Sequence, residues 1–282
     1  MNPHPLSEPD EIRSDLESGN GLIRLKLDSK DIHNNNPKEW FLSFAKKIGT
    51  PVSQSASGEL ILSIRNESYD QDDSRIRGPN TNRKLGFHTD RCDVIGFLCL
   101  QPAKSGGENQ VVSSPEVEKI IRKERPDLHE SLCQPFPYKR HIVDKGNNLP
   151  YCEQPIFSWK DSHFACSYLR VLIERADQDS ECPDLSNEQR DALDFFDSIC
   201  ERKTLQTRFT LEAGEILLLN NWTTLHRRTA FDDFEEPEKR RHLLRVWLSV
   251  PNSRPLNESF RANFGATEAG AVRGGMQPFG NR

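Results

Sequence analysis

The sequence predicts a β-rich α+β fold organised as one domain. Strand-like patterns occur near both ends of the chain, helix signals are concentrated between about residues 114 and 200, and no repeat or shift in composition marks a domain boundary. A chain of 282 residues can form one large domain with a full hydrophobic core. We therefore expect a flexible arm over residues 1–20 and a single domain over residues 21–282, with a helical insert at about 114–200.

The first part of the domain is predicted to contain a strand, a helix, a second strand and a long polar loop. Residues 21–27 alternate apolar and polar side chains, which is typical of a half-buried strand. An Asn-Pro pair opens the helix predicted over residues 36–49, because asparagine caps a helix and proline suits its first turn. Residues 59–65 form the second predicted strand. The polar stretch 66–84 is too long for an ordinary connection, so we interpret it as a functional loop.

The rest of the chain is predicted to place helices between two groups of strands. Ser186 and Gln189 form a capping-box pattern at the start of one helix, whereas residues 125–165 show no clear pattern. The predicted strands cover residues 94–100, 108–112, 204–211, 215–220 and 242–250, and the predicted helices cover residues 114–121, 164–176 and 186–199. A glycine-rich tail follows.

Composition argues against several classes of protein. The formal net charge is -5 and the pI is near 6.0, so no basic field favours nucleic acid or an anionic membrane. Mean hydropathy is -0.73, and no apolar run approaches the roughly 20 residues of a membrane span. The polar N-terminus lacks the features of a signal peptide. Seven cysteines, none in a CxxC pair, indicate reduced thiols in a cytoplasmic protein rather than a zinc site.

Three residues are candidates for a metal site. His88 and Asp90 stand two residues apart in a segment expected to be extended, so their side chains would project to the same face. An iron site built from two histidines and one carboxylate needs such a pair. His226, after the apolar strand 215–220, would be the second histidine. The alternatives are a surface histidine and aspartate in a loop and a hydrogen-bonded core histidine, but the three residues together favour the metal site.

Two arginines on the last predicted strand are candidates for anion binding. Alternation places Arg241, Leu243, Arg245 and Trp247 on one face of the strand. Two inward-facing guanidinium groups would be unfavourable unless each meets an anion, and guanidinium binds carboxylate through a two-pronged contact. The pair therefore predicts two acidic groups, one from a co-substrate and one from a substrate. The alternative is that both arginines lie at the surface beside the acidic run 232–238.

These stretches together resemble the taurine dioxygenase (TauD/TfdA-like) family of iron(II)/2-oxoglutarate-dependent oxygenases, to which clavaminate synthase and the arginine hydroxylases are similar. The resemblance extends from about residue 60 to residue 250. The matching motifs are His88-x-Asp90, the turn Ser105-Gly106-Gly107-Glu108, the segment Asn220 to His226, and the pair Arg241 and Arg245. As a set these motifs are specific, although no single one is.

The resemblance implies a double-stranded β-helix, or jelly-roll barrel, with flanking and inserted helices. It implies that iron(II) is held by His88, Asp90 and His226, which would be the catalytic centre. Arg241 falls where the family binds the far carboxylate of 2-oxoglutarate. At Asn109 the family often has a threonine that helps to bind 2-oxoglutarate; this is a departure, but an amide can donate the same hydrogen bond.

Substrate contacts are also implied by the resemblance. Arg245 falls where several members of the family bind an acidic group of the substrate. Gln54 is near a position that touches substrate in relatives. The loop that ends at Lys84 and the segment 151–170 are expected to form walls of the pocket, with Lys84 as a substrate contact.

The resemblance implies an oxygenase that uses iron(II), 2-oxoglutarate and O2, releases succinate and CO2, and oxidises an unactivated C–H of a small anionic substrate, such as an amino acid or related acid. Hydroxylation is the default, and desaturation or ring closure stays open. Asp90 argues against halogenation, because related halogenases have a small residue there. The rival hypotheses are a non-catalytic protein that binds a small acid on the same barrel and a cupin dioxygenase without 2-oxoglutarate. A homo-oligomer is compatible with the sequence.

Overall fold

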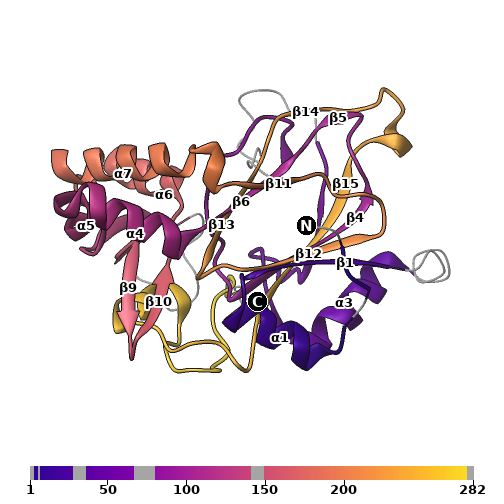
Figure 1. The fold of residues 1–282 in the computed structure, drawn as a ribbon, viewed down its shortest axis with the longest axis horizontal. Helices are drawn as coiled ribbons and strands as arrows, with labels where there is room; N and C mark the ends of the chain where they lie inside the picture. Colours follow the sequence, from indigo (N-terminus) through magenta and orange to yellow (C-terminus); the bar gives the residue numbers. More distant parts are fainter. Residues whose placement is uncertain (1–2, 6, 28–35, 67–79, 141–148, 278–282) are drawn as a thin grey trace.

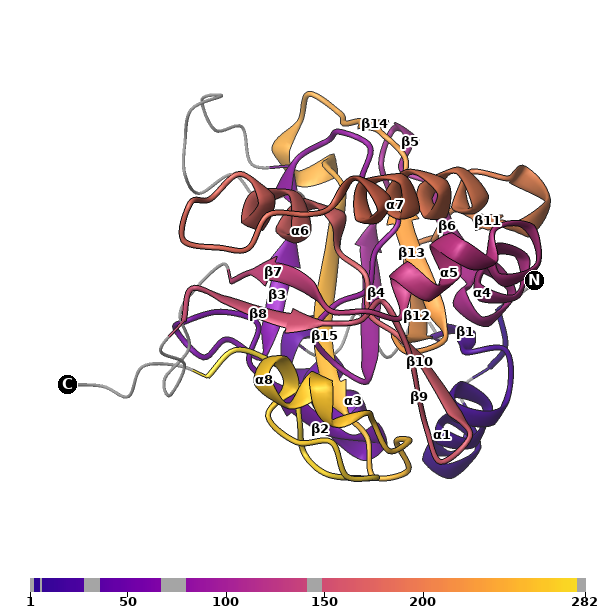
Figure 2. The ribbon, with the colours of Figure 1, turned by 90° about the vertical axis from the view of Figure 1, so that its left-hand side faces the viewer.

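A six-stranded antiparallel sheet forms the centre of the molecule. The computed structural model describes residues 3–5, 7–27, 36–66, 80–140 and 149–277. The sheet has the strand order β1–β12–β4–β15–β2, with β3 also paired to β15 (Figures 1 and 2). Its strands are β1 (Leu22–Lys26), β2 (Thr50–Val52), β3 (Ile61–Ile64), β4 (Val94–Gln101), β12 (Glu215–Asn220) and β15 (His242–Ser249).

A smaller antiparallel sheet shares a hydrophobic core with the six-stranded sheet. It has the order β11–β6–β13, and its strands are β6 (Asn109–Ser113), β11 (Thr207–Phe209) and β13 (Thr224–Arg228). Val111 and Phe209 of the small sheet lie in one buried cluster with Leu217 and Leu243 of the large sheet. Two antiparallel sheets that bury a common core confirm the predicted β-rich fold of jelly-roll type.

The other face of the large sheet is covered by helices. Leu218 of β12 and Leu244 of β15 pack in a second cluster with Phe41, Ala45 and other residues of α3 (Pro37–Ile48). Because side chains alternate along a strand, Leu217 and Leu243 face the other way, toward the small sheet. Arg245 of β15 is therefore directed into the space between the sheets, as the alternation predicts, and Arg241, immediately before the strand, lines the same cavity.

A group of helices and two hairpins lies beside the small sheet and forms its own core (Figures 1 and 2). The predicted capping box forms, because Ser186 and Gln189 each accept a main-chain N–H bond from the other at 3.0 Å. The elements are α4 (Ser114–Glu124), α5 (Pro126–Leu132), β7 (Phe136–Lys139), β8 (Tyr151–Gln154), β9 (Phe157–Lys160), β10 (His163–Cys166), α6 (Arg170–Asp177) and α7 (Asn187–Cys200).

Short elements complete the fold. They are the strand pair β5 (Ser105–Gly106) and β14 (Phe231–Asp232), the helix α8 (Arg261–Phe264), and the 3-10 helices η2 (Lys203–Leu205), η3 (Pro237–Lys239) and η4 (Glu258–Phe260). In the part of the chain that the structure describes, no helix is both long and apolar enough to cross a membrane.

The prediction of a loose arm over residues 1–20 is wrong for its second half. Residues 9–18 form the helix α1 (Pro9–Ser18), which packs on the large sheet. Ile12 and Leu16 are one helical turn apart and only 1% and 2% exposed. The apolar stripe consists of these two side chains in an otherwise polar segment, so it gives a weak signal in the sequence. The division into one domain stays a prediction.

Three predicted elements have different limits in the structure. Residues 164–176 were predicted as a helix, but residues 163–166 pair with β9 as a hairpin strand, and the helix α6 begins only at Arg170. The hairpin turns at Asp161 and Ser162, which both adopt positive φ. The predicted strand 204–211 is a 3-10 helix followed by the three-residue strand β11. In short segments such as these, pairing partners outweigh local propensity.

We predict that Leu16→Ala lowers the free energy of unfolding by about 2–5 kcal/mol, because it leaves a cavity between α1 and the sheet. Denaturant unfolding followed by circular dichroism measures the change. The control is Ser14→Ala, at an exposed position of the same helix, with an expected change within about 0.5 kcal/mol. Equal effects of the two substitutions would show that α1 does not pack on the sheet in solution.

Candidate metal centre

Two main-chain hydrogen bonds bring the candidate histidines together. His88 N–H donates to the His226 carbonyl at 3.1 Å, and His226 N–H donates to the His88 carbonyl at 3.0 Å. The two residues thus form an isolated antiparallel bridge. His226 follows the apolar strand β12, as expected, but a turn separates the two, and His226 lies in the middle of β13, a strand that was not predicted. The ring centroids are 4.5 Å apart.

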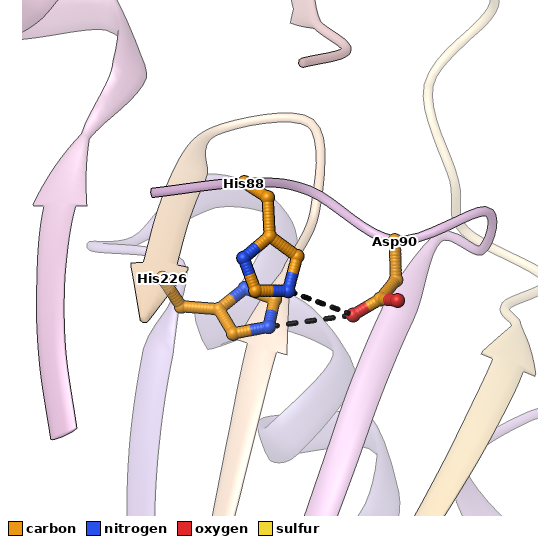
Figure 3. Close-up of side chains that lie close together, drawn as sticks. All are labelled: His88, Asp90 and His226. Atoms are coloured by element: carbon orange, nitrogen blue, oxygen red, sulfur yellow. Dashed lines mark ion pairs between the residues drawn. The ribbon is translucent and has the colours of Figure 1, made fainter. Parts of the chain in front are cut away.

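The two imidazoles and the Asp90 carboxylate converge on one point (Figure 3). Asp90 Oδ2 is 3.3 Å from Nε2 of His226 and 3.9 Å from Nε2 of His88. The three ligand atoms lie within 4.8 Å of one another, and no other cluster of this kind is found in the described residues. Asp90 Oδ2 is buried and has no hydrogen-bond partner among those residues. An unsatisfied carboxylate beside two imidazoles fits a bound metal ion.

Local contacts set the protonation of the cluster. His88 Nδ1–H donates to the Gly86 carbonyl at 2.9 Å, which leaves Nε2 free as a metal ligand. Burial and the neighbouring His226 lower the pKa of His88 to about 4, so its ring is neutral at neutral pH. Burial alone would raise the pKa of Asp90, but His226 and the Arg245 guanidinium outweigh it and hold the pKa below its usual range. The neutral imidazole of His88 and the ionised carboxylate of Asp90 are the forms that bind a divalent cation.

Asn221 fixes the main chain at Asp90, and the sequence analysis did not single it out. This side chain is 1% exposed, and its Oδ1 accepts the Asp90 N–H at 3.0 Å. Its Nδ2 donates to Cys92 Sγ at 3.0 Å, and its own N–H donates to the Asp93 carbonyl at 2.9 Å. These contacts join the turn after β12 to the turn that carries the carboxylate ligand.

Behind this turn, a buried carboxylate links the sheet to the C-terminal tail. Asp93 Oδ1 accepts from Arg273 Nε at 2.6 Å and from Trp222 Nε1 at 2.9 Å. Asp93 Oδ2 accepts the Val250 N–H at 3.0 Å. The Gly275 N–H donates to the Arg91 carbonyl at 2.7 Å. The tail therefore holds the segment 91–93, immediately after the metal ligand Asp90, through both side-chain and main-chain bonds.

A cavity next to the metal cluster contains several cationic side chains. It is lined by Ile64, Leu85, His88, Asp90, Phe97, Asn109, Val111, Leu217, His226, Arg227, Arg228, Arg241, Leu243 and Arg245. Arg227 is neutralised on the far side of β13, where Glu201 accepts from Nη2 at 2.8 Å and Gln110 accepts from Nε at 2.6 Å. Arg228, Arg241 and Arg245 also line the cavity, and a cavity with several guanidinium groups is suited to anionic ligands.

The candidate substrate contacts Arg245 and Gln54 are bonded to each other. Gln54 Oε1 accepts from Arg245 Nε at 2.7 Å, and Gln54 Nε2 donates to the Arg245 carbonyl at 2.9 Å. Arg245 Nη1 is 3.9 Å from Asp90 Oδ1, so the guanidinium lies beside the metal cluster. Gln54 does not line the cavity. In the structure it orients Arg245, and a direct contact of Gln54 with substrate stays a prediction.

Arg241 and Asn109 lie at another part of the same cavity. Arg241 is 5% exposed, and its Nη1 is buried without a hydrogen-bond partner among the described residues. Burial lowers the pKa of Arg241 to about 10. A Cβ at Gly107 would lie 3.6 Å from Arg241 Nε, and Gly107 has a φ of +69°, which disfavours a side chain. Such a Cβ would make only an ordinary contact with the arginine, so the backbone conformation of the turn, and not crowding, favours glycine here.

Among the described residues, neither Lys84 nor the segment 151–170 lines the cavity. Lys84 is exposed and pairs with Glu201 at 3.1 Å, so its expected role as a substrate contact is not supported by its position. Residues 151–170 contribute no lining side chain; they pack in the hairpins and the helical core. Most of the loop 66–84 lies outside the described residues. Arg228 was missed by the sequence analysis, although it follows His226 by two positions on one strand.

We predict that His226→Ala abolishes binding of Fe(II) and that Asn221→Ala weakens it by about 10- to 100-fold. The first substitution removes a ligand, and the second releases the main chain at Asp90. Anaerobic titration calorimetry measures both affinities. The control is His163→Ala, which removes an exposed histidine outside the cluster and should bind iron as the wild type does. Wild-type affinity in His226→Ala would contradict this metal centre.

Comparison with known proteins identifies the family. The family model described as "Taurine catabolism dioxygenase TauD, TfdA family" matches residues 31–247. FR-33289 synthase of Streptomyces rubellomurinus (strain ATCC 31215) is 31% identical over 79% of this chain and 67% of its own length. The taurine hydroxylase-like protein SAT17 of Stachybotrys chartarum (strain CBS 109288 / IBT 7711) is 29% identical, and the match covers 73% of this chain and 54% of that protein.

Solved structures with the same fold support this result. An asparagine oxygenase in complex with Fe(II), 3-hydroxyasparagine and succinate has a TM-score of 0.64 at 17% identity, over 85% of this chain and 79% of that one. The non-haem iron oxygenase OrfP in complex with Fe and α-ketoglutaric acid has a TM-score of 0.58 at 14% identity, with the same two coverages. At such identities the likeness concerns the fold. The family match, which covers most of the chain, shows that this protein belongs to the TauD/TfdA family.

Proposed function

We propose that this iron(II)- and 2-oxoglutarate-dependent oxygenase oxidises an unactivated C–H of a small anionic substrate, an amino acid or a related acid, with succinate and CO2 as co-products. The observation that carries the proposal is the position of Arg245. Its guanidinium is 8% exposed, is oriented by Gln54 and lies beside the metal cluster. A second fixed cation, in addition to Arg241, favours a substrate with its own acidic group.

The proposed metal ligands are His88, Asp90 and His226. Nε2 of each imidazole and an oxygen of the carboxylate would bind iron(II), which has open positions for 2-oxoglutarate and O2 in such a site and supplies the oxidising chemistry. The Gly86 carbonyl fixes the tautomer of His88. Asn221 fixes the main chain at Asp90.

We assign the far carboxylate of 2-oxoglutarate to Arg241, with Asn109 as a nearby hydrogen-bond donor. Arg241 Nη1 lacks a partner among the described residues, and both side chains line the cavity. The cavity lining also includes the apolar side chains Phe97, Leu217 and Leu243. Apolar walls exclude water and strengthen the charged contacts at the two ends of the cavity.

Hydroxylation is the proposed outcome, with desaturation and ring closure as its alternatives. The resemblance to the family argues against halogenation, because Asp90 supplies a carboxylate where related halogenases have a small residue. The mass of the product separates the remaining outcomes: hydroxylation adds one oxygen atom, whereas desaturation and ring closure remove two hydrogen atoms. Similar proteins that act on amino acids include the asparagine oxygenase named above. Free amino acids and short amino-acid-like acids are therefore the first substrates to test.

We predict that Fe(II)-loaded protein gives a weak visible charge-transfer band when 2-oxoglutarate is added without oxygen, because the 2-oxo acid takes the open positions on the metal. With oxygen, an anionic amino-acid-like substrate should increase the release of succinate. Absence of the band in folded, metal-loaded protein would contradict the oxygenase function and favour the rival hypothesis of a small-acid-binding protein.

We predict that Arg245→Ala raises the substrate KM by about 10- to 100-fold, since it removes a charge-assisted contact. The charge-transfer band with 2-oxoglutarate should persist in this variant. Arg65→Ala removes an exposed arginine outside the cavity and serves as the matched control, with unchanged KM. If KM is unchanged in Arg245→Ala, the substrate's acidic group binds elsewhere.

A further inference from the structure

Arg228 is a buried cation in the cavity with no part in the function proposed above. It lies on β13 two residues after His226, so strand alternation directs both side chains to the same side, and both line the cavity. Arg228 is 5% exposed. Its neighbour Arg227 also lines the cavity, but the Arg227 guanidinium is neutralised by Glu201. The two adjacent arginines therefore have different environments.

The hydrogen bonds of Arg228 leave its charge uncompensated. Nη1 donates to the Thr229 carbonyl at 3.1 Å and Nη2 donates to the Thr81 carbonyl at 2.8 Å. A guanidinium has five N–H donors, and these two neutral acceptors engage two of them. Within the described part of the chain, no carboxylate forms an ion pair with Arg228 or with Arg241.

Arg228 and Arg241 flank the same aromatic ring. Their Cζ atoms lie 4.5 Å and 5.1 Å from the centroid of Phe231. Asp233 attracts both cations from a distance, and its Oδ1 is engaged by the main-chain N–H of Arg241 at 2.8 Å. Two like charges held so close in a buried site repel each other, and this arrangement is stabilised when an anion binds between them.

The second anion site is at a different place. Arg245 lies beside Asp90 and contacts Trp247, not Phe231. Asn109, by contrast, stands directly opposite Arg228 in the register of β6 and β13. Arg228, Arg241 and Asn109 therefore belong to one end of the cavity, and Arg245 belongs to the end next to the metal ligand.

We propose that Arg228 is a second guanidinium in the site for the far carboxylate of 2-oxoglutarate, and that it binds this carboxylate together with Arg241. The inference rests on the role proposed above for Arg241. A carboxylate has two oxygens with about four acceptor positions, so two guanidinium groups can bind it at once. Arg228 is then a co-substrate-binding residue, and it favours 2-oxo acids that carry a second acidic group over those that lack one.

The test compares two co-substrates in two variants. 2-Oxoglutarate and 2-oxopentanoate have the same carbon chain, but 2-oxopentanoate lacks the far carboxylate. Each is titrated anaerobically into Fe(II)-loaded wild type, Arg228→Gln and Arg241→Gln, with the visible band as the readout of binding. We expect Arg228→Gln to weaken the affinity for 2-oxoglutarate by about 10- to 100-fold and to leave the affinity for 2-oxopentanoate within about twofold of the wild-type value.

Other outcomes would contradict the proposed role of Arg228 alone or the roles of both Arg228 and Arg241. If Arg228→Gln weakens the binding of both ligands equally, or of neither, Arg228 is structural and the inference is wrong. If Arg241→Gln alone loses the preference for 2-oxoglutarate, the inference fails but the proposed function stands. If the wild type binds both ligands equally, the proposed role of Arg241 fails as well. Should Arg228→Gln fold poorly, Arg228→Lys replaces it in the test, because lysine keeps a charge and most of the side-chain volume. We expect Arg228→Lys to weaken the affinity for 2-oxoglutarate less than a neutral side chain would, and to leave the affinity for 2-oxopentanoate unchanged.

Discussion

The metal centre depends on one isolated antiparallel bridge. Reciprocal main-chain hydrogen bonds join His88 to His226, two residues far apart in the sequence. Because the bridge is made by backbone atoms, it fixes the main-chain positions of both histidines. The Gly86 carbonyl then selects the tautomer of the His88 imidazole. Metal ligands on rigid backbone need little reorganisation when the ion binds. His226 has the firmer support, since β13 pairs with β6 along its whole length.

The carboxylate ligand has a different support. Asp90 lies in a turn, and a buried network holds that turn from behind through Asn221, Asp93 and Arg273. Arg273 and Asp93 are almost fully buried, so breaking their pair would leave an uncompensated charge in the interior. The C-terminal tail thus supports the metal centre from outside the cavity, since none of its residues lines the cavity. Through Arg273 and Asp93 it holds the turn that carries Asp90.

The sequence predicted the features that depend on local spacing. The pair His88 and Asp90 and the inward face of β15 follow from the alternation of side chains along extended backbone. The hydrogen bond from Arg245 to Gln54 could not be predicted, because β2, which directly precedes Gln54, must first pair with β15 to bring these residues together. The helix α1 was missed for a related reason: its two apolar residues acquire meaning only when the sheet is present to bury them.

Arg228 shows how a strand missing from the prediction conceals a candidate functional residue. Without β13, the two arginines that follow His226 have no defined direction. In the structure His226 lies inside β13, and alternation then sends Arg227 to Glu201 and Arg228 into the cavity. The two adjacent arginines therefore differ in environment: Arg227 is a neutralised structural cation, whereas Arg228 is uncompensated. Only the second has charge left for a ligand, and its position beside Phe231 and Arg241 places that charge where a carboxylate can use it.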